Sequence, residues 1–309
     1  MSPDDVDVVI LNWRTAPLAI EAARSAIENG ATSIIVVDNC SQDDSIHLIK
    51  REIGSFVGIL SMPRNGGFGE GNNAGARLAK RPLVLFMNTD VKLQPGALKK
   101  MAEVFDKEPR AAVVSPALYY PDNRPHASAF LFPTPVRTLK ISLGLDRLGN
   151  RFGLAGLSGN IDIRRNGAYS GRVESLYGAC LLVRREAFEE VGGFDEDFFM
   201  YCEETDLIFR LAQKGWKAIR VSSAEAIHTH GESVKGSPVD CLIPMYESRR
   251  IYARKHFSRL GRITASMASA AGLLARILFS SRNSDRLRYL AALRASLGMA
   301  PKADPRQKV

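Results

Sequence analysis

Cysteine is scarce in this sequence, and its spacing excludes the commonest kinds of cysteine chemistry. The four cysteines are scattered along 309 residues and form no close pair: Cys40, Cys180, Cys202 and Cys241. Zinc knuckles and dithiol redox motifs both require closely spaced pairs. We therefore expect four reduced, isolated thiols, as in a cytoplasmic protein.

Long apolar runs are also missing. A membrane-spanning helix needs roughly 18 or more apolar residues in a row, and the longest candidate, residues 265–279, is broken by Arg276. The first apolar run follows Asp4, Asp5 and Asp7, where a secretory signal would have a basic stretch. The sequence predicts neither a spanning helix nor a signal, so we expect a cytoplasmic chain.

Acidic residues are nearly absent after Arg249. Only Asp285 and Asp304 follow it, among frequent arginines, and the whole chain has a formal net charge of +9. Such a tail fits a polyanion or an anionic membrane surface. A basic nucleic-acid-binding protein is the weaker alternative, because its charges would form a face interleaved with aromatic side chains. We therefore expect no nucleic-acid partner.

Short apolar runs alternate with segments of helical spacing over the first 115 residues. The apolar runs are residues 6–11, 33–37, 57–60, 83–87 and 112–115, and the helical segments are 17–29, 41–52, 72–79 and 96–105. This alternation predicts an α/β fold with a doubly wound, mainly parallel sheet. Ligands of such sheets bind beyond the carboxyl ends of the strands.

The remainder of the chain divides into three parts. Residues 116–172 are rich in proline and glycine, which predicts a long, partly irregular segment carrying a lid or acceptor loop. Further strands are expected at 175–183 and 217–221, with helices at 186–191 and 204–214, and helices alone from residue 244. We place a boundary after residue 240. Residues 241–309 are then a basic, amphipathic helical extension with a disordered tail.

Polar residues follow several of the predicted strands. Asp38 can accept a hydrogen bond from the edge of a pyrimidine base, although a role in capping the turn is the alternative. Asp90, with Asn88 before it, can bind a hard divalent cation that bridges a diphosphate, although it can equally be a turn residue. His228 can supply a further metal ligand, and the alternative for His228 and His230 is a pair of surface histidines.

A glycine-rich stretch runs from Asn65 to Gly75. Closely spaced glycines let a backbone approach a ligand and enter a helix N-terminus, where amide groups favour anions. A dinucleotide-binding fingerprint is excluded, because the stretch follows the third strand and Glu70 to Asn72 break the required spacing.

Three acids, Glu203, Glu204 and Asp206, follow an aromatic run at the expected start of a helix. Partial burial there would raise the pKa of a carboxyl group and suit it to be a general base. Two structural roles are equally open, namely favourable interaction with the helix dipole and an ion pair between Asp206 and Arg210.

In this order, the motifs resemble those of the family 2 inverting glycosyltransferases, which have the single-domain GT-A fold. The resemblance covers roughly residues 6–257 and is greatest to the rhamnosyltransferase-like and galactofuranosyltransferase-like branch. It rests on Leu-Asn-Trp at 11–13, Val-Asp-Asn-Cys-Ser at 37–41, the glycine-rich stretch, Asn-Thr-Asp at 88–90, Gly-Ala-Cys at 178–180, Gly-Gly-Phe-Asp-Glu at 192–196, and the acids.

The resemblance implies a role for each of these residues. The base of the donor would lie against Asp38, Asn12 and Trp13, and the nucleotide against Asn88 and the stretch from Asn65 to Asn73, which includes Gly67 and Gly69. Asp90 and His228 would bind Mg²⁺ or Mn²⁺ across the donor diphosphate. Glu204 would be the catalytic base, with Glu203 and Asp206 shaping the site. Which of these acids is the base stays open.

The same resemblance implies an activity and partners. The chain would transfer a sugar, with L-rhamnose as the best guess, from a dTDP- or UDP-sugar to a glycan or lipid-linked acceptor in cell-surface polysaccharide synthesis. Its C-terminal helices would dock at the cytoplasmic face of the inner membrane, or else pack on the catalytic domain or form a homo-oligomer interface. A nucleotidyltransferase is the alternative enzyme, but it would carry a basic glycine-rich loop after the first strand.

Overall fold

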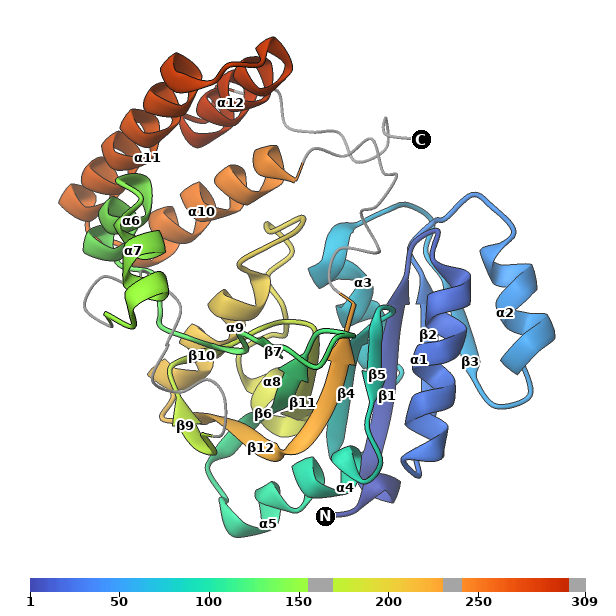
Figure 1. Ribbon diagram of the computed structural model, residues 1–309. Coiled ribbons are helices and arrows are strands. Elements are labelled where there is room, and N and C mark those ends of the chain that lie inside the picture. Colours follow the sequence, from blue (N-terminus) through green and yellow to red (C-terminus); the bar gives the residue numbers. More distant parts are fainter. Residues whose placement is uncertain (155–168, 230–240, 300–309) are drawn as a thin grey trace.

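A central sheet has helices on both faces, and a separate layer of helices lies beside it in the computed structural model (Figure 1). The structure describes residues 1–154, 169–229 and 241–299. His230 and most of the predicted disordered tail lie outside the described residues.

The first half of the sheet is parallel, as predicted. Strand β1 (Val6–Asn12) pairs with β2 (Ile34–Asp38) on one side and β4 (Leu83–Asn88) on the other, and β2 pairs with β3 (Gly58–Ser61). The apolar side chains of β1, β2 and β4 are buried on both faces, which explains their unbroken hydrophobic runs. Because these strands run the same way, Asn12, Asp38 and Asn88 end at one edge.

The second half of the sheet is mixed. Strand β11 (Cys180–Arg184) lies antiparallel between β4 and β6 (Ala111–Tyr119). Strand β12 (Lys217–His228) runs parallel to β6 and pairs at its far end with the short β5 (Val91–Leu93), which runs antiparallel to it. The strand order is β3-β2-β1-β4-β11-β6-β12-β5. This order brings the end of β12 back to the residues that follow β4.

Helices cover the two faces of the sheet. One apolar core includes residues of α1 (Ala16–Glu28), α2 (Ser45–Ile53) and α4 (Ala97–Ala102), and the other includes residues of α8 (Arg185–Glu190) and α9 (Glu203–Gln213). The remaining short elements are α5 (Val104–Lys107), β7 (Pro125–His126), β8 (Ala129–Phe130), β9 (Gly171–Val173) and β10 (Ser175–Leu176).

Helix α3 (Gly67–Ala76) begins well before residue 72, where the sequence predicted its start. Its glycines face other parts of the chain. A Cβ atom on Gly75 would lie 2.4 Å from Val9 Cγ1, and one on Gly71 would lie 2.3 Å from Leu11 Cδ1. The missing side chains therefore let α3 pack directly on β1.

Other predicted boundaries were also wrong. The segment predicted as partly irregular contains two helices that were not assigned from the sequence, α6 (Pro135–Ser142) and α7 (Leu145–Phe152). Helix α6 has strong local start signals, since Thr134 accepts a hydrogen bond from the Arg137 amide and Pro135 occupies the first turn. Strand β12 extends past residue 221 because a bulge after Val221 lets it continue along β6.

The C-terminal layer consists of α10 (Leu242–His256), α11 (Arg259–Phe279) and α12 (Asn283–Ser296), with α6 packed against α11. Small residues allow that packing, because a Cβ on Gly272 would lie 2.7 Å from the Ser142 carbonyl oxygen. Within the described chain, α11 is the one helix that is long and apolar enough to cross a membrane by length and composition, although Arg276 interrupts it.

Candidate active site

The edge formed by β1, β2 and β4 carries a buried polar network. Asn12 donates from Nδ2 to Asp38 Oδ1 at 2.8 Å and to Ser41 Oγ at 3.2 Å, and Ser41 donates its hydroxyl to the same Asp38 oxygen at 2.5 Å. The Ser41 amide donates to Asp38 Oδ2 at 3.0 Å. Asp38 is therefore held rigidly at the end of its strand, with spare acceptor capacity on Oδ2.

The network continues toward Asp90. Asn12 Oδ1 accepts a hydrogen bond from the Thr15 hydroxyl, which in turn lies 3.1 Å from the Thr89 hydroxyl. Trp13 is half-buried beside this chain, and the guanidinium of Arg14 lies over its ring. The structure thus brings together Asn12, Trp13 and Asp38, and connects them to the residue before Asp90.

The glycine-rich stretch is tied to the protein itself. Asn65 Oδ1 accepts from Asn39 Nδ2 at 2.8 Å and from the Gly67 amide at 3.0 Å. Gly67 has a left-handed φ of 83°, and a Cβ there would lie 2.1 Å from the Phe199 carbonyl oxygen. Asn73 exchanges hydrogen bonds with the backbone of Phe194.

Those contacts hold α3 in place. They fix it to the loop that precedes α9, and Gly69 lies against the same loop. A nucleotide role for Asn65, Gly67, Gly69 and Asn73 stays a prediction.

Asp90 and His228 meet at the end of β12. His228 pairs with Val91 in the β5 register, and its Nε2 lies 3.3 Å from Asp90 Oδ1, with both side chains 2% exposed. That carboxylate oxygen has no hydrogen-bond partner within the described residues. A buried carboxylate oxygen without a partner beside an imidazole is a suitable site for a divalent cation.

The described residues contain no cluster of three or more protein ligands for a metal. Water and diphosphate oxygens would therefore complete the coordination around Asp90 and His228, as is usual for Mg²⁺. Asn88 ends β4 two residues before Asp90, and its backbone N–H donates to the Ala179 carbonyl.

Two aromatic side chains lie against His228, and no motif in the sequence marks either of them. The Tyr177 and His126 rings lie 5.6 Å and 5.1 Å from the His228 ring between centroids. Burial raises the pKa of Tyr177, and the charges of Glu204 and Asp90 raise it further. The charges that act on Tyr177 thus come both from Asp90 and from the acids of α9.

Helix α9 starts at Glu203 after two consecutive left-handed residues, Tyr201 and Cys202. Non-glycine residues rarely adopt this conformation, and backbone strain of this kind is concentrated at functional sites. Burial raises the pKa of Glu204, and burial together with the charge of Glu204 raises that of Glu203 well above its ordinary value. Raised pKa values of this kind suit a carboxyl group to proton transfer.

Asp206 has a different environment. Arg210 donates from Nε to Asp206 Oδ2 at 2.7 Å, and His256 Nε2 lies 2.6 Å from Oδ1. Burial acts to raise the pKa of Asp206, but the hydrogen bonds from His256 and Arg210 hold it below its ordinary value. With both oxygens engaged, Asp206 joins α9 to α10 and is poorly placed to accept a proton.

A pocket of about 340 Å³ opens beside Glu204. Tyr177, Tyr201 and Glu204 line it, and side chains from α6, α10 and α11 supply much of the remaining lining. Glu204 touches the space above Gly178, where a Cβ would lie 3.3 Å from its Cγ. Of the three acids, Glu204 is the one that faces this pocket.

Comparison with known proteins identifies related sequences over most of the chain. A model of Glycosyl transferase family 2 matches residues 7–192, and a model of Glycosyl transferase family group 2 matches residues 157–279. An N-acetylglucosaminyl-diphospho-decaprenol L-rhamnosyltransferase of Mycobacterium tuberculosis is 28% identical over 75% of this chain and 77% of its own length. The low-salt glycan biosynthesis hexosyltransferase Agl10 of Haloferax volcanii is 26% identical over 90% and 86%.

Solved structures share the fold. The mannosyltransferase PcManGT of Pyrobaculum calidifontis, in complex with GDP-Man and Mn²⁺, aligns with a TM-score of 0.57 at 14% identity, over 96% of this chain and 89% of that one. TarS 1–349 of S. aureus, in complex with UDP-GlcNAc, aligns with a TM-score of 0.54 at 15% identity, over 96% and 81%. The chain therefore has the predicted GT-A fold.

The buried contacts of Asp206 predict a large loss of stability on substitution. We expect Asp206→Asn to lower the free energy of unfolding at pH 7 by about 3–5 kcal/mol, because it leaves Arg210 and His256 without their buried partner. Since the folded pKa of Asp206 is below its ordinary 3.8, its stabilisation is present at neutral pH and is lost as the pH falls through the folded pKa. The difference from wild type should therefore shrink in acid.

Urea unfolding at several pH values measures this effect. Glu189→Gln is a matched control, because Glu189 pairs with Arg185 at the same i,i+4 spacing but is exposed; a change below about 0.5 kcal/mol is expected. Equal losses for the two variants would contradict the structural role of Asp206.

Proposed function

The chain belongs to glycosyl transferase family 2, and we propose that it is an inverting, metal-dependent enzyme that moves L-rhamnose from a nucleoside-diphosphate donor to a hydroxyl group. The M. tuberculosis relative named above supports rhamnose and a lipid-linked acceptor, in keeping with a role in polysaccharide synthesis. One observation carries the mechanism. Tyr177 packs against His228, with 5.6 Å between the ring centroids, and lines the same pocket as Glu204, so one side chain adjoins both proposed groups.

Glu204 is the base in this proposal. It lines the pocket, whereas Glu203 is buried and its Oε2 has no hydrogen-bond partner within the described residues. Glu204 removes the proton of the acceptor hydroxyl as that oxygen attacks the anomeric carbon from the face opposite the leaving group. A single in-line displacement inverts the anomeric configuration. Burial raises the pKa of Glu204, and the charge of Glu204 adds to the effect of burial in raising the pKa of Glu203.

The donor binds along the edge formed by β1, β2 and β4. Asp38 holds the base of a dTDP- or UDP-sugar through Oδ2. Asn12 fixes the orientation of Asp38, and Trp13 lies at the side of the base. Asp90 and His228 hold Mg²⁺ or Mn²⁺ when it is bound, and that cation supplies positive charge to the diphosphate leaving group. Mn²⁺ accompanies GDP-Man in the structure of PcManGT, which supports a divalent cation.

The acceptor approaches from the C-terminal layer, and that layer meets a membrane surface. Helix α11 buries one side against α6 and α12, while Leu274, Leu278 and Phe279 on its other side are 49%, 73% and 89% exposed. Exposed apolar side chains beside many arginines and few acids fit an anionic membrane surface. Helix α10 instead packs on α9 through Asp206 and through a hydrogen bond from Ser248 to the Met200 carbonyl.

Glu204→Gln should reduce kcat about 10²–10⁴-fold with little change in donor KM, because it removes the proton acceptor and keeps the side-chain shape. Burial raises the pKa of Glu204 above its ordinary 4.5, so wild-type activity should fall as the pH drops through that raised value. Initial rates from pH 5 to 9 measure this. Near-wild-type transfer by Glu204→Gln, with loss in Glu203→Gln, would assign the base to Glu203.

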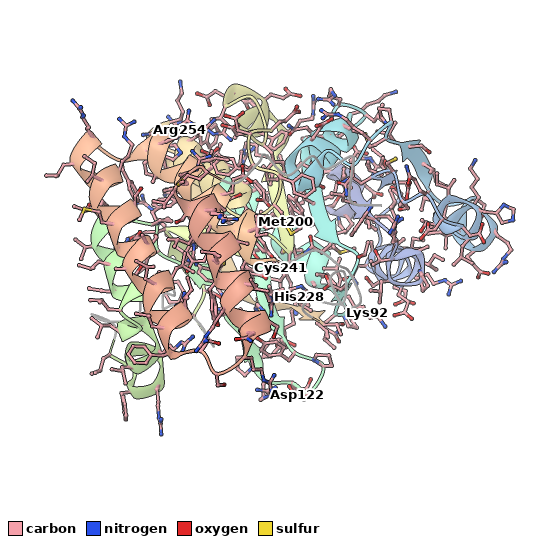
Figure 2. All side chains as sticks on the ribbon, turned by 90° about the horizontal axis from the view of Figure 1, so that it is seen from above. Lys92, Asp122, Met200, His228, Cys241 and Arg254 are labelled. Carbon is pink, nitrogen blue, oxygen red and sulfur yellow. The ribbon has the colours of Figure 1, made fainter. Side chains whose placement is uncertain are left out.

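Removal of the divalent cation should abolish transfer, and Mg²⁺ or Mn²⁺ should restore it. Asp90→Asn should raise the metal concentration needed for half-maximal rate at least roughly tenfold, since a neutral amide replaces the only acid of the pair. Metal titration of initial rates measures this, with Asp122→Asn as the control, because Asp122 is an exposed acid at the lower edge of the molecule in Figure 2. Full activity in the presence of a chelator would show that transfer does not need a divalent cation.

Substitution of the exposed face of α11 should abolish vesicle binding. We expect the triple change of Leu274, Leu278 and Phe279 to serine to prevent flotation with anionic liposomes and to leave transfer to a soluble acceptor unchanged. Truncation after residue 240 is a poorer test, because it removes His256 from Asp206. Undiminished flotation of the triple variant would exclude this face as the docking surface.

A further inference from the structure

Two arginines of α10 line the pocket beside Glu204 without an acidic partner. Arg249 and Arg250 both contribute to the lining, whose only carboxylates are Glu204 and Asp146. Neither arginine forms an ion pair within the described residues, although many others in the chain do. Guanidinium groups that line a pocket and lack a counterion are suited to an anionic ligand.

Arg250 provides the strongest single observation. Its Nε atom is buried and has no hydrogen-bond partner within the described residues. Its guanidinium lies near Gly298, just beyond α12, where a Cβ would approach Nη1 to 3.3 Å, so the side chain is confined between two helices. Buried donors are almost always satisfied, which indicates that a ligand supplies the missing acceptor.

Arg249 adds a second positive group to the same wall. Its guanidinium lies 5.4 Å from the centre of the Tyr246 ring, and the Tyr246 hydroxyl accepts a hydrogen bond from Arg276 at 2.8 Å. Tyr246 is therefore placed between two cations and holds Arg249 at the pocket. No acid of α10, α11 or α6 lines this wall.

We propose that Arg249 and Arg250 bind the phosphate groups of a sugar-diphosphate acceptor whose hydroxyl reaches Glu204. This inference rests on the proposed transfer, since Glu204 lines the same pocket as the two arginines. Two guanidinium groups offer more donors than one carboxylate can accept, and they match the several oxygens of a diphosphate. Apolar lining from Ile141, Ala265 and Phe257 suits the hydrocarbon that follows the phosphates.

A pair of soluble acceptors tests the proposal, one sugar linked through diphosphate to a short prenyl chain and the same sugar as a neutral alkyl glycoside. We expect Arg249→Gln with Arg250→Gln to raise KM for the diphosphate acceptor at least roughly tenfold. The KM values for the neutral glycoside and for the donor should stay within about twofold of wild type. Equal changes for both acceptors, or none, would overturn the proposal.

Arg254→Gln is the matched control, because Arg254 lies on the same helix but is exposed, and it lies apart from His228 in the view of Figure 2. It should leave every KM unchanged. Arg249→Lys with Arg250→Lys keeps both charges and should give an intermediate KM. Thermal unfolding followed by circular dichroism identifies any variant that has lost its fold.

Direct binding separates this inference from the proposed function. Inorganic pyrophosphate, titrated in a chelator so that the metal site is inactive, should bind wild type and Arg254→Gln about tenfold more tightly than the double glutamine variant. If wild type transfers no sugar to either acceptor, the proposed function fails, and this titration still decides the anion site. If the double variant instead loses only flotation with anionic vesicles, the ligand is a phospholipid head group and the proposal is wrong.

Discussion

The buried carboxylate of Asp206 holds together the parts on which the site depends. Through Arg210 it is connected to the carbonyl groups of Val191 and Gly193, because the same guanidinium donates to both. Through His256 it is connected to α10. The helix that presents Glu203 and Glu204 is therefore connected both to the turn after α8 and to the C-terminal layer. Proton transfer needs that precision, since small displacements of a base cost much of its effect.

The glycine-rich stretch also fixes a helix of the site in position. Its glycines seat α3 against β1 and against the loop before α9, while Asn73 connects that helix to Phe194. Glu203 and Glu204 are thereby held in a fixed position relative to the edge formed by β1, β2 and β4. This stretch resembles a ligand-binding loop in sequence. In the described structure its glycines mainly allow α3 to pack closely on β1 and on the loop before α9.

Local signals in the sequence were enough to predict the parallel half of the sheet. Buried strands with unbroken apolar runs and turn residues after each one identified the parallel half of the sheet, and the family resemblance supplied the GT-A fold. The start of α3 was misplaced because glycine suggests a turn, whereas here it permits close packing. Helices α6 and α7 were missed because proline and glycine are frequent around them, although Thr134 and Pro135 form a good helix start.

The candidate site was only partly predictable, for a geometric reason. Asp90 and His228 were both identified, but their meeting depends on the register between β5 and β12, which no local pattern specifies. The i,i+4 contact of Asp206 with Arg210 was foreseen as an alternative, while its second partner, His256, lies fifty residues further along. Tyr177, Arg249 and Arg250 carry no motif: Tyr177 lies in the turn between β10 and β11, and the two arginines reach the pocket through the packing of α10.

The origin of the pocket walls has a consequence for how such a chain can diversify. The edge assigned to the donor is built almost entirely from the first ninety residues, whereas α6, α10 and α11 supply most of the pocket beside Glu204. Drift in the late helices can therefore change which molecule receives the sugar while the recognition of the sugar nucleotide is inherited intact. Chimaeras that exchange these helices between relatives would therefore exchange the acceptor pocket and leave the donor edge unchanged.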